Sequence, residues 1–201
     1  LGEEQSGHIR EVGYELYQAM LEETIAKLKS GDIQGPEDDG QWAPQINLGV
    51  PVLIPEDYVR DLDVRLGLYR RLSGLTTKVE LEGFAAELID RFGDLPKEVN
   101  TLLVVVRIKA MCKRAGIAKL DAGPKGITLQ FHNDKFADPA GLVDFIQSEK
   151  GQAKVKDNKV ILTRAWASEA DKIKGSFAVA RDLAEKVVAT EKAQKAKRAA
   201  G

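Results

Sequence analysis

The chain has 201 residues, of which 43% are hydrophobic and 30% are charged, a balance typical of a globular protein. This length predicts one domain of ordinary size plus an appendage. Lys and Arg total 30 against 31 for Asp and Glu, and a net charge of −1 argues against a dedicated DNA-binding domain. No apolar run approaches the roughly 20 residues that span a bilayer, and no secretory pattern is present. Cys112 is the only cysteine, which excludes an internal disulfide, so we expect a cytoplasmic protein.

The first 30 residues predict a polar loop followed by one amphipathic helix. Apolar residues recur at helical spacing from Ile9 to Leu28, and Gly31 stands where a C′ glycine would end the helix. A helix of this length must bury its apolar stripe against a neighbour. Because a fold rarely begins on a polar loop bracketed by Gly2 and Gly7, we expect the chain to start inside a larger protein.

Residues 31–45 predict an acidic linker, because they contain four acids, two prolines and no base. Trp42 stands out in this polar stretch, and partial burial against a domain surface is the favoured interpretation. Residues 46–54 then form a β-type run, in which Pro51 allows only an edge strand or an extended arm.

Three helices joined by short turns are expected next, ending at Gly116. Gly93 separates the second from the third, and Pro96 suits the first turn of the third. Consecutive helices with short connections should pack as one helical layer. Their predicted apolar faces are Leu62, Leu66, Tyr69 and Leu72, then Leu81, Phe84, Ala85, Leu88, Ile89 and Phe92, then Val99, Leu102, Leu103, Val106 and Ala110.

The pattern changes after Gly116 to two predicted β-hairpins, at residues 117–131 and 154–163, with turns at 122–126 and 157–159. Each hairpin is followed by a helix, the first starting at Asp138-Pro139 and the second at Ser168. The predicted fold class is α+β, with a three-helix layer packed with a small antiparallel sheet and two further helices. We assign residues 46–190 to one domain and expect the basic tail, 191–201, to fray.

The search for catalytic groups finds none, so we expect no catalytic residue, metal site or cofactor site in this chain. His8 and His132 do not lie at ligand spacing from each other or from Cys112. The turn at 123–126 lacks the length and the following helix of a phosphate-binding loop. Glu87 and Asp90 are one helical turn apart, which is common on any solvated helix face.

Two motifs remain as candidates for non-enzymatic roles. In the first, Gln5 and the glycines around it could make hydrogen bonds at a moving joint, although an ordinary helix lead-in capped by Ser6 is favoured from the residues alone. In the second, Glu87, Asp90 and Arg91 face away from the apolar side of their helix. For an arbitrary domain, a solvated face followed by a helix stop would be the better interpretation.

The first seven residues, LGEEQSG, resemble the segment that closes the motor of RecG-like DNA translocases. The stretches 65–71, RLGLYRR, and 87–96, ELIDRFGDLP, resemble the C-terminal domain of transcription-repair-coupling factors. The resemblance implies that residues 1–30 end a translocase motor, with Gly2, Gln5 and Gly7 in its translocation motif. It also implies that residues 46–190 form a regulatory domain.

In that family the parent protein is an ATP- and Mg-dependent translocase on double-stranded DNA that removes stalled RNA polymerase at lesions and recruits UvrA for excision repair. The resemblance implies a non-catalytic lid over a UvrB-like module of the same parent chain, which competes with UvrA. Glu87 and Asp90, with Arg91 beside them, would be the interdomain contact. The alternative is a nucleic-acid-binding module that uses Arg70, Arg71 and the tail residues Lys192, Lys195, Lys197 and Arg198. A small hydrolase using Glu87 and Asp90 ranks last.

Overall fold

The computed structural model describes residues 42–136 and 138–199, which fall into two compact units. Of the described residues, the first unit contains Trp42 and residues 51–106, and the second contains residues 43–50 together with 107–199. The range 46–190, which is predicted to be one domain, includes residues of both units. The sequence does not indicate the boundary between the units, because it falls at Val106 inside one continuous helix. The helical spacing of apolar residues continues without interruption across that position. The loop at residues 1–7, the helix predicted at 9–29 and most of the predicted linker lie outside the described residues.

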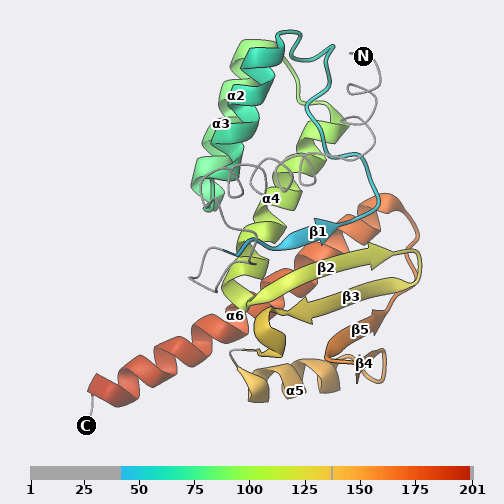
Figure 1. Cartoon of the computed structure of the whole chain (residues 1–201), viewed down its shortest axis with the longest axis vertical. Helices are drawn as coiled ribbons and strands as arrows, with labels where there is room; N and C mark the ends of the chain where they lie inside the picture. The colour runs from blue at the N-terminus through green and yellow to red at the C-terminus, as the bar shows by residue number, and fades with distance from the viewer. Residues whose placement is uncertain (1–41, 137, 200–201) are drawn as a thin grey trace, which may run out of the picture. The chain divides into compact units, whose positions relative to one another are not determined.

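The first unit is the predicted helical layer (Figure 1). Its helices are α2 (Leu62–Ser73), α3 (Lys78–Phe92) and the first half of α4 (Lys97–Ala115). Asp61 caps α2 by accepting a hydrogen bond from Val64 N at 2.9 Å. Thr77 and Glu80 form a reciprocal capping box at the start of α3. The three helices share one core with the preceding turn, made of Ile54, Val59, Leu68, Leu72, Leu81, Phe84, Leu88, Val99, Leu102 and Val106.

A buried arginine ties the segment before α2 to that helix. Arg65 is 9% exposed, and its Nη1 donates to Val59 O at 2.7 Å. Its Nη2 lies 3.7 Å from a carboxylate oxygen of Glu56. A second link joins Ile54 N to the Tyr69 hydroxyl at 2.6 Å. Both links satisfy polar groups that would otherwise be buried without partners.

The second unit is built on a five-stranded sheet in the order β1-β2-β3-β5-β4. The strands are β1 (Gln45–Asn47), β2 (Ile117–Gly123), β3 (Gly126–Phe131), β4 (Ala153–Lys156) and β5 (Lys159–Thr163). Both predicted hairpins are present, as β2-β3 and β4-β5. β1 pairs with β2 in parallel, so the sheet is mixed where an antiparallel sheet was expected. A parallel neighbour needs a long crossover connection, and here the helices α2 to α4 lie between the two strands in sequence. The α+β fold class is confirmed.

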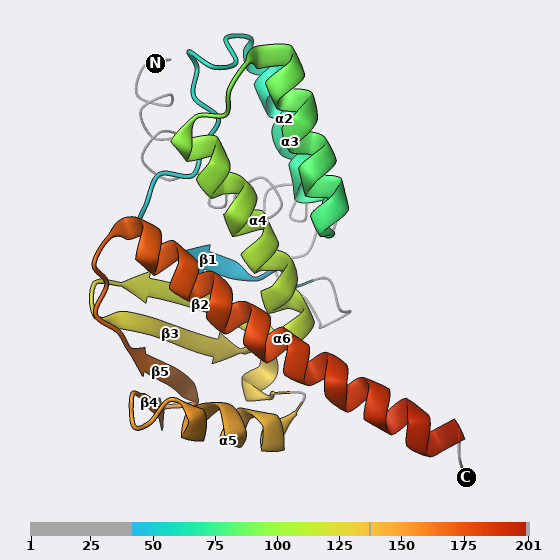
Figure 2. The ribbon, with the colours of Figure 1, turned by 180° about the vertical axis from the view of Figure 1, so that it is seen from behind.

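Helices α5 (Pro139–Ser148) and α6 (Glu169–Ala199) complete the second unit, and α6 runs across one face of the sheet (Figure 2). The tail that was expected to fray continues α6 as a helix to Ala199, because Ala, Lys, Gln and Arg are strong helix formers. A hydrogen bond from Thr190 Oγ1 to Asp138 Oδ2, 2.7 Å long, links α6 to the start of α5. The covered side of the sheet consists of Leu120, Ala122, Ile127, Leu129, Phe131, Val160 and Leu162.

Trp166 joins the sheet to α6 and requires a glycine there. Its Nε1 donates to Gly123 O at 2.9 Å. A Cβ atom on Gly175 would lie 2.4 Å from Trp166 Cζ3 and 2.6 Å from Cη2, well inside van der Waals contact. Gly175 is therefore the residue that lets the indole pack against α6.

We predict that Gly175→Ala forces the indole out of place and lowers the free energy of unfolding by about 1–3 kcal/mol. The measurement is urea denaturation followed by Trp166 fluorescence in a Trp42→Phe background, where the native emission should shift to the red. Gly67→Ala in α2 is the matched control, because a Cβ there meets no atom within 4 Å. That control should raise the free energy of unfolding by about 0.5–1 kcal/mol. An unshifted, undiminished Gly175→Ala protein would contradict the proposed packing.

Candidate functional site on helix α3

Helix α3 presents the charged residues of the second sequence motif because its register is fixed by the core. Leu81, Phe84 and Leu88 are buried, so residues at other helical angles face outwards. The helix ends at Gly93, whose φ of +90° favours glycine and whose N–H donates to Ile89 O at 2.9 Å. Both ends of the helix are therefore defined by local hydrogen bonds.

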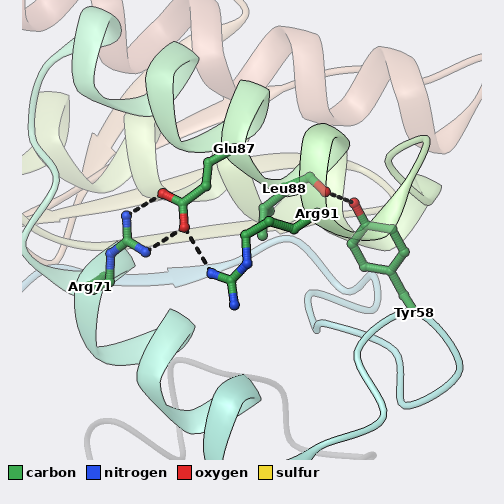
Figure 3. A network of polar contacts seen from close by, with 5 residues as sticks. All are labelled: Tyr58, Arg71, Glu87, Leu88 and Arg91. Atoms are coloured by element: carbon green, nitrogen blue, oxygen red, sulfur yellow. Dashed lines mark hydrogen bonds and ion pairs between the residues drawn. The ribbon is translucent and has the colours of Figure 1, made fainter.

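Glu87 is held by two arginines, one from each side (Figure 3). Arg71, in the last turn of α2, donates from Nη1 to Oε1 at 2.8 Å and from Nη2 to Oε2 at 2.6 Å. Arg91, one turn further along α3, donates from Nη1 to Oε1 at 2.9 Å. A two-pronged arginine–carboxylate contact is stronger and more directional than a single ion pair. Glu87 therefore links α2 to α3.

Each of these arginines also lies over an aromatic ring. The Arg71 Cζ atom is 5.3 Å from the centroid of Phe84, and the Arg91 Cζ atom is 4.8 Å from the centroid of Phe92. Cation–π contacts at exposed sites contribute roughly 0.5–1 kcal/mol. The rings, which are fixed by the core, thus orient the two guanidinium groups that hold Glu87.

The arginines keep Glu87 ionised. Hydrogen bonds from Arg71 and then from Arg91 lower the pKa of Glu87 from 4.5 to about 2. Such a carboxylate has no proton to give at neutral pH, and both of its oxygens are already engaged. Glu87 is therefore not a proton donor for the hydrolase interpretation, in which Glu87 and Asp90 act as an acid–base pair.

Tyr58 closes the C-terminal end of α3 (Figure 3). Its hydroxyl lies 2.9 Å from Gly93 O and 3.2 Å from Leu88 O, so it donates to carbonyl groups at the helix end. Its ring meets Phe92 edge to face, with 5.8 Å between the centroids. Burial, followed by the charge of Asp94, raises the pKa of Tyr58. Sequence reasoning missed this role, because 30 residues separate Tyr58 from Leu88.

The outermost side of α3 has a different character. Asp90 is exposed, and no ion pair engages it within the described part of the chain. Val79 and Ile89 are 77% and 46% exposed, although both are large and apolar. The prediction that Ile89 belongs to the buried face of this helix is therefore wrong, because Leu81, Phe84 and Leu88 set a narrower buried stripe. A Cβ atom on Gly83 would meet nothing within 4 Å, so no packing among the described residues requires this glycine. We call the six residues Val79, Glu82, Gly83, Ala86, Ile89 and Asp90 the outer face of α3.

The structure therefore separates residues that the sequence analysis grouped together. Glu87 and Arg91 bind each other and Arg71, whereas Asp90 stands apart on the outer face. Arg71 belonged to the predicted nucleic-acid alternative, and its charge is instead used by Glu87, while Arg70 stays exposed. The other basic residues of that alternative, in the range 192–198, lie exposed on the end of α6. Gly2, Gln5 and Gly7 lie outside the described residues.

Metal-binding clusters and membrane-spanning helices are both absent from residues 42–136 and 138–199. No cluster of His, Cys, Asp and Glu among them could hold a metal ion. Within the same residues, the helices all fall short of the length and apolar character needed to cross a bilayer.

We predict that Glu87→Gln lowers the free energy of unfolding at pH 7 by about 0.5–1 kcal/mol, as expected for a partly exposed ion-pair network. The pKa of Glu87 is lower in the folded state, so its contribution is fully present above pH 4.5 and is lost as the pH falls toward 2. Urea denaturation at pH 7, 4 and 3 should show the difference between wild type and variant shrinking at the lower values.

Asp90→Asn is the control for this prediction, because it also removes one carboxylate from α3. It should change the free energy of unfolding by less than about 0.5 kcal/mol at pH 7. A Glu87→Gln deficit that is the same at pH 7 and pH 3 would show that the ion pairs are not its origin.

The comparisons with known proteins agree on one family. The TRCF domain family matches residues 48–142. Transcription-repair-coupling factors from Rickettsia bellii and from Escherichia coli are 47% and 37% identical over 166 and 149 residues, which are 82% and 74% of this chain. The chain spans only 14% and 13% of the length of these two relatives.

A solved structure gives the same result for the fold. The crystal structure of the C-terminal domain of transcription-repair coupling factor superimposes with a TM-score of 0.60, covering 72% of this chain and 93% of that chain at 18% identity. The sequence relatives therefore identify the family and the solved structure confirms the fold. The chain belongs to the transcription-repair-coupling factor family and contains its TRCF domain.

Proposed function

We propose that this domain is a non-catalytic regulatory lid of a cytoplasmic transcription-repair-coupling factor. In this proposal the outer face of α3 docks reversibly on a UvrB-like module of the same parent chain and competes there with UvrA. The parent would be an ATP- and Mg-dependent translocase on double-stranded DNA that displaces stalled RNA polymerase, and ATP and Mg would be cofactors of its motor.

The observation that carries this proposal is the composition of the outer face of α3. A solvated helix face normally carries charged residues, yet four of its six residues are apolar or glycine. Val79 is 77% exposed and Gly83 has open space above it. A glycine in a helix interior costs roughly 0.5–1 kcal/mol relative to alanine, and no contact among the described residues offsets that cost. Close approach of a partner would explain both features.

Asp90 supplies the charge for such a contact, and Glu87 has a supporting role. Asp90 is the exposed carboxylate at the end of the face, so it suits a basic group on the partner. Glu87 keeps Arg71 and Arg91 in place, and thereby fixes α3 against α2. An exposed ion pair contributes roughly 0.2–1 kcal/mol. A few such contacts give a coupling free energy of about 1–3 kcal/mol, which is small enough for a reversible switch.

We predict that Asp90→Arg in the full-length parent opens the lid and increases UvrA capture in a pull-down by roughly fivefold or more, the effect of losing about 1 kcal/mol of coupling. Asp144→Arg on α5 is the matched control, since it makes the same charge change on an exposed helical position of the other unit. It should leave UvrA capture unchanged. Equal capture by wild type and Asp90→Arg would refute the docking role of this face.

Gly83→Ala provides a second test, in which stability and docking change in opposite directions. The added methyl group has open space within the unit, so the free energy of unfolding should rise by about 0.5–1 kcal/mol. The same methyl group would hold a partner away from the helix, so UvrA capture by the parent should increase. Gly67→Ala in α2 should give the same gain in stability without the increase in capture. A Gly83→Ala parent that captures no more UvrA than wild type would argue against close approach at this position.

A further inference from the structure

The net charge of −1 conceals a strong segregation of charge along the chain. Residues 107–201, most of the second unit, carry 20 Lys and Arg against 11 Asp and Glu, a formal charge of +9. Residues 51–106 carry 7 basic against 10 acidic residues, a formal charge of −3. The whole-chain balance therefore says little about the second unit, which is strongly basic. A field of this size attracts polyanions over distances of about a Debye length.

Part of this charge is collected on one face of the sheet. The buried residues of β2, β3 and β5 alternate with exposed or half-buried ones, so the two faces of the sheet differ. Helix α6 lies across the buried face and is seen behind the sheet in Figure 1, whereas no described element of this unit crosses the face turned to the viewer. This open face carries Lys119, Asp121, Thr128, Gln130, Lys154, Lys156, Lys159 and Ile161.

The strand register arranges the lysines in rows. Lys119 pairs with Gln130, Gln130 pairs with Lys159, and Lys159 pairs with Lys156. One row of hydrogen-bond donors therefore crosses four strands, about 14 Å at the usual strand spacing of roughly 4.8 Å. Lys154 lies in the next row, two residues from Lys156. We call Lys154, Lys156 and Lys159 the lysine cluster.

The lysine cluster is not explained by the stability of the sheet. Lys156 and Lys159 are direct cross-strand partners, and like charges in that position are destabilising. Within the described part of the chain, none of the three has an ion pair. Lys119 differs, because Asp121 lies 3.3 Å from its Nζ on the same strand. Asp157, in the turn between β4 and β5, is the nearest acid in sequence, and its φ of +50° belongs to the turn. Three unneutralised positive charges thus remain on one open surface.

We propose that the lysine cluster binds the phosphate backbone of duplex DNA without reading its sequence. Lysines are point charges that contact phosphates, and contacts of this kind position a protein without specifying bases. Single-stranded nucleic acid is disfavoured because the open face has no aromatic side chain on which bases could stack. An acidic protein is disfavoured because Ile161 is the one large apolar residue on the face, and protein interfaces depend on buried apolar or aromatic anchors.

The direct test is binding of the 201-residue chain to a fluorescein-labelled 24-base-pair DNA, measured by anisotropy at 50–200 mM salt. Three phosphate contacts predict a slope of log Kobs against log salt of about −3. The triple variant K154Q/K156Q/K159Q should weaken binding at 50 mM salt by tenfold or more and bring the slope close to zero. The charge-preserving variant K154R/K156R/K159R should keep both the affinity and the slope, which separates loss of charge from loss of structure.

The matched control is K192Q/K195Q/K197Q on the exposed end of α6, which removes the same charge from the same unit. This control should keep the slope of the wild type. Four results would overturn the proposal: no binding by the wild type at 50 mM salt, an equal loss in both glutamine variants, a loss in the α6 variant alone, or tighter binding to a 24-nucleotide single strand than to the duplex. Displacement of the duplex by polyglutamate at equal charge concentration would also overturn it, in favour of an acidic protein partner. None of these results bears on docking through α3, which is measured by UvrA capture.

Discussion

The burial of Leu88 determines where every candidate functional residue on α3 lies. Leu88 has no exposed surface and belongs to the core that α2, α3 and the first half of α4 share. Since successive helical residues are 100° apart, fixing Leu88 in the core places Glu87 on one flank of the helix and Ile89 and Asp90 toward its outer side. The position of Leu88 thus places Glu87 where it pairs with arginines of the same unit, and places Asp90 where a partner could contact it.

This division gives the acidic motif two unlike parts. On the flank facing α2, Glu87 is paired with Arg71 and Arg91, and each arginine lies over an aromatic ring, so these charges stabilise the helical layer. On the outer face, Val79 is exposed, Gly83 has no neighbour that requires a glycine, and Asp90 has no ion pair among the described residues. Each of these features lowers the stability of the helix, and no described contact compensates for it. Residues that lower stability in a folded domain often serve a contact that the domain alone does not contain. Lys156 and Lys159, which face each other across β4 and β5 in the other unit, are a second example, because their like charges also lower stability.

The sequence predicted the features that depend on local periodicity and on caps. Helical spacing located α2, α3 and α4, and turn residues located both hairpins, because these signals lie within a few positions of each other. It could not predict the pairing of Arg71 with Glu87 or of Tyr58 with the end of α3, since those contacts depend on how the helices meet in space. The parallel pairing of β1 with β2 and the boundary between the units within α4 were not predicted either, because they too depend on contacts between residues far apart in the sequence. The spacing of Val79, Gly83 and Ala86 could have indicated the outer face of α3, but only the structure shows that no described residue covers it.

The segregation of charge has a consequence for the chain in solution. In a protein that is close to neutral by cancellation, the acidic and basic segments each keep a large local charge, unlike in a protein whose charges are evenly mixed. At low ionic strength the acidic part of one copy, residues 1–106, would attract the basic part of another, and the association would weaken steeply as salt is added. The calculated isoelectric point of 6.2 therefore does not describe its behaviour on ion-exchange media, where such a chain can be retained by resins of either sign.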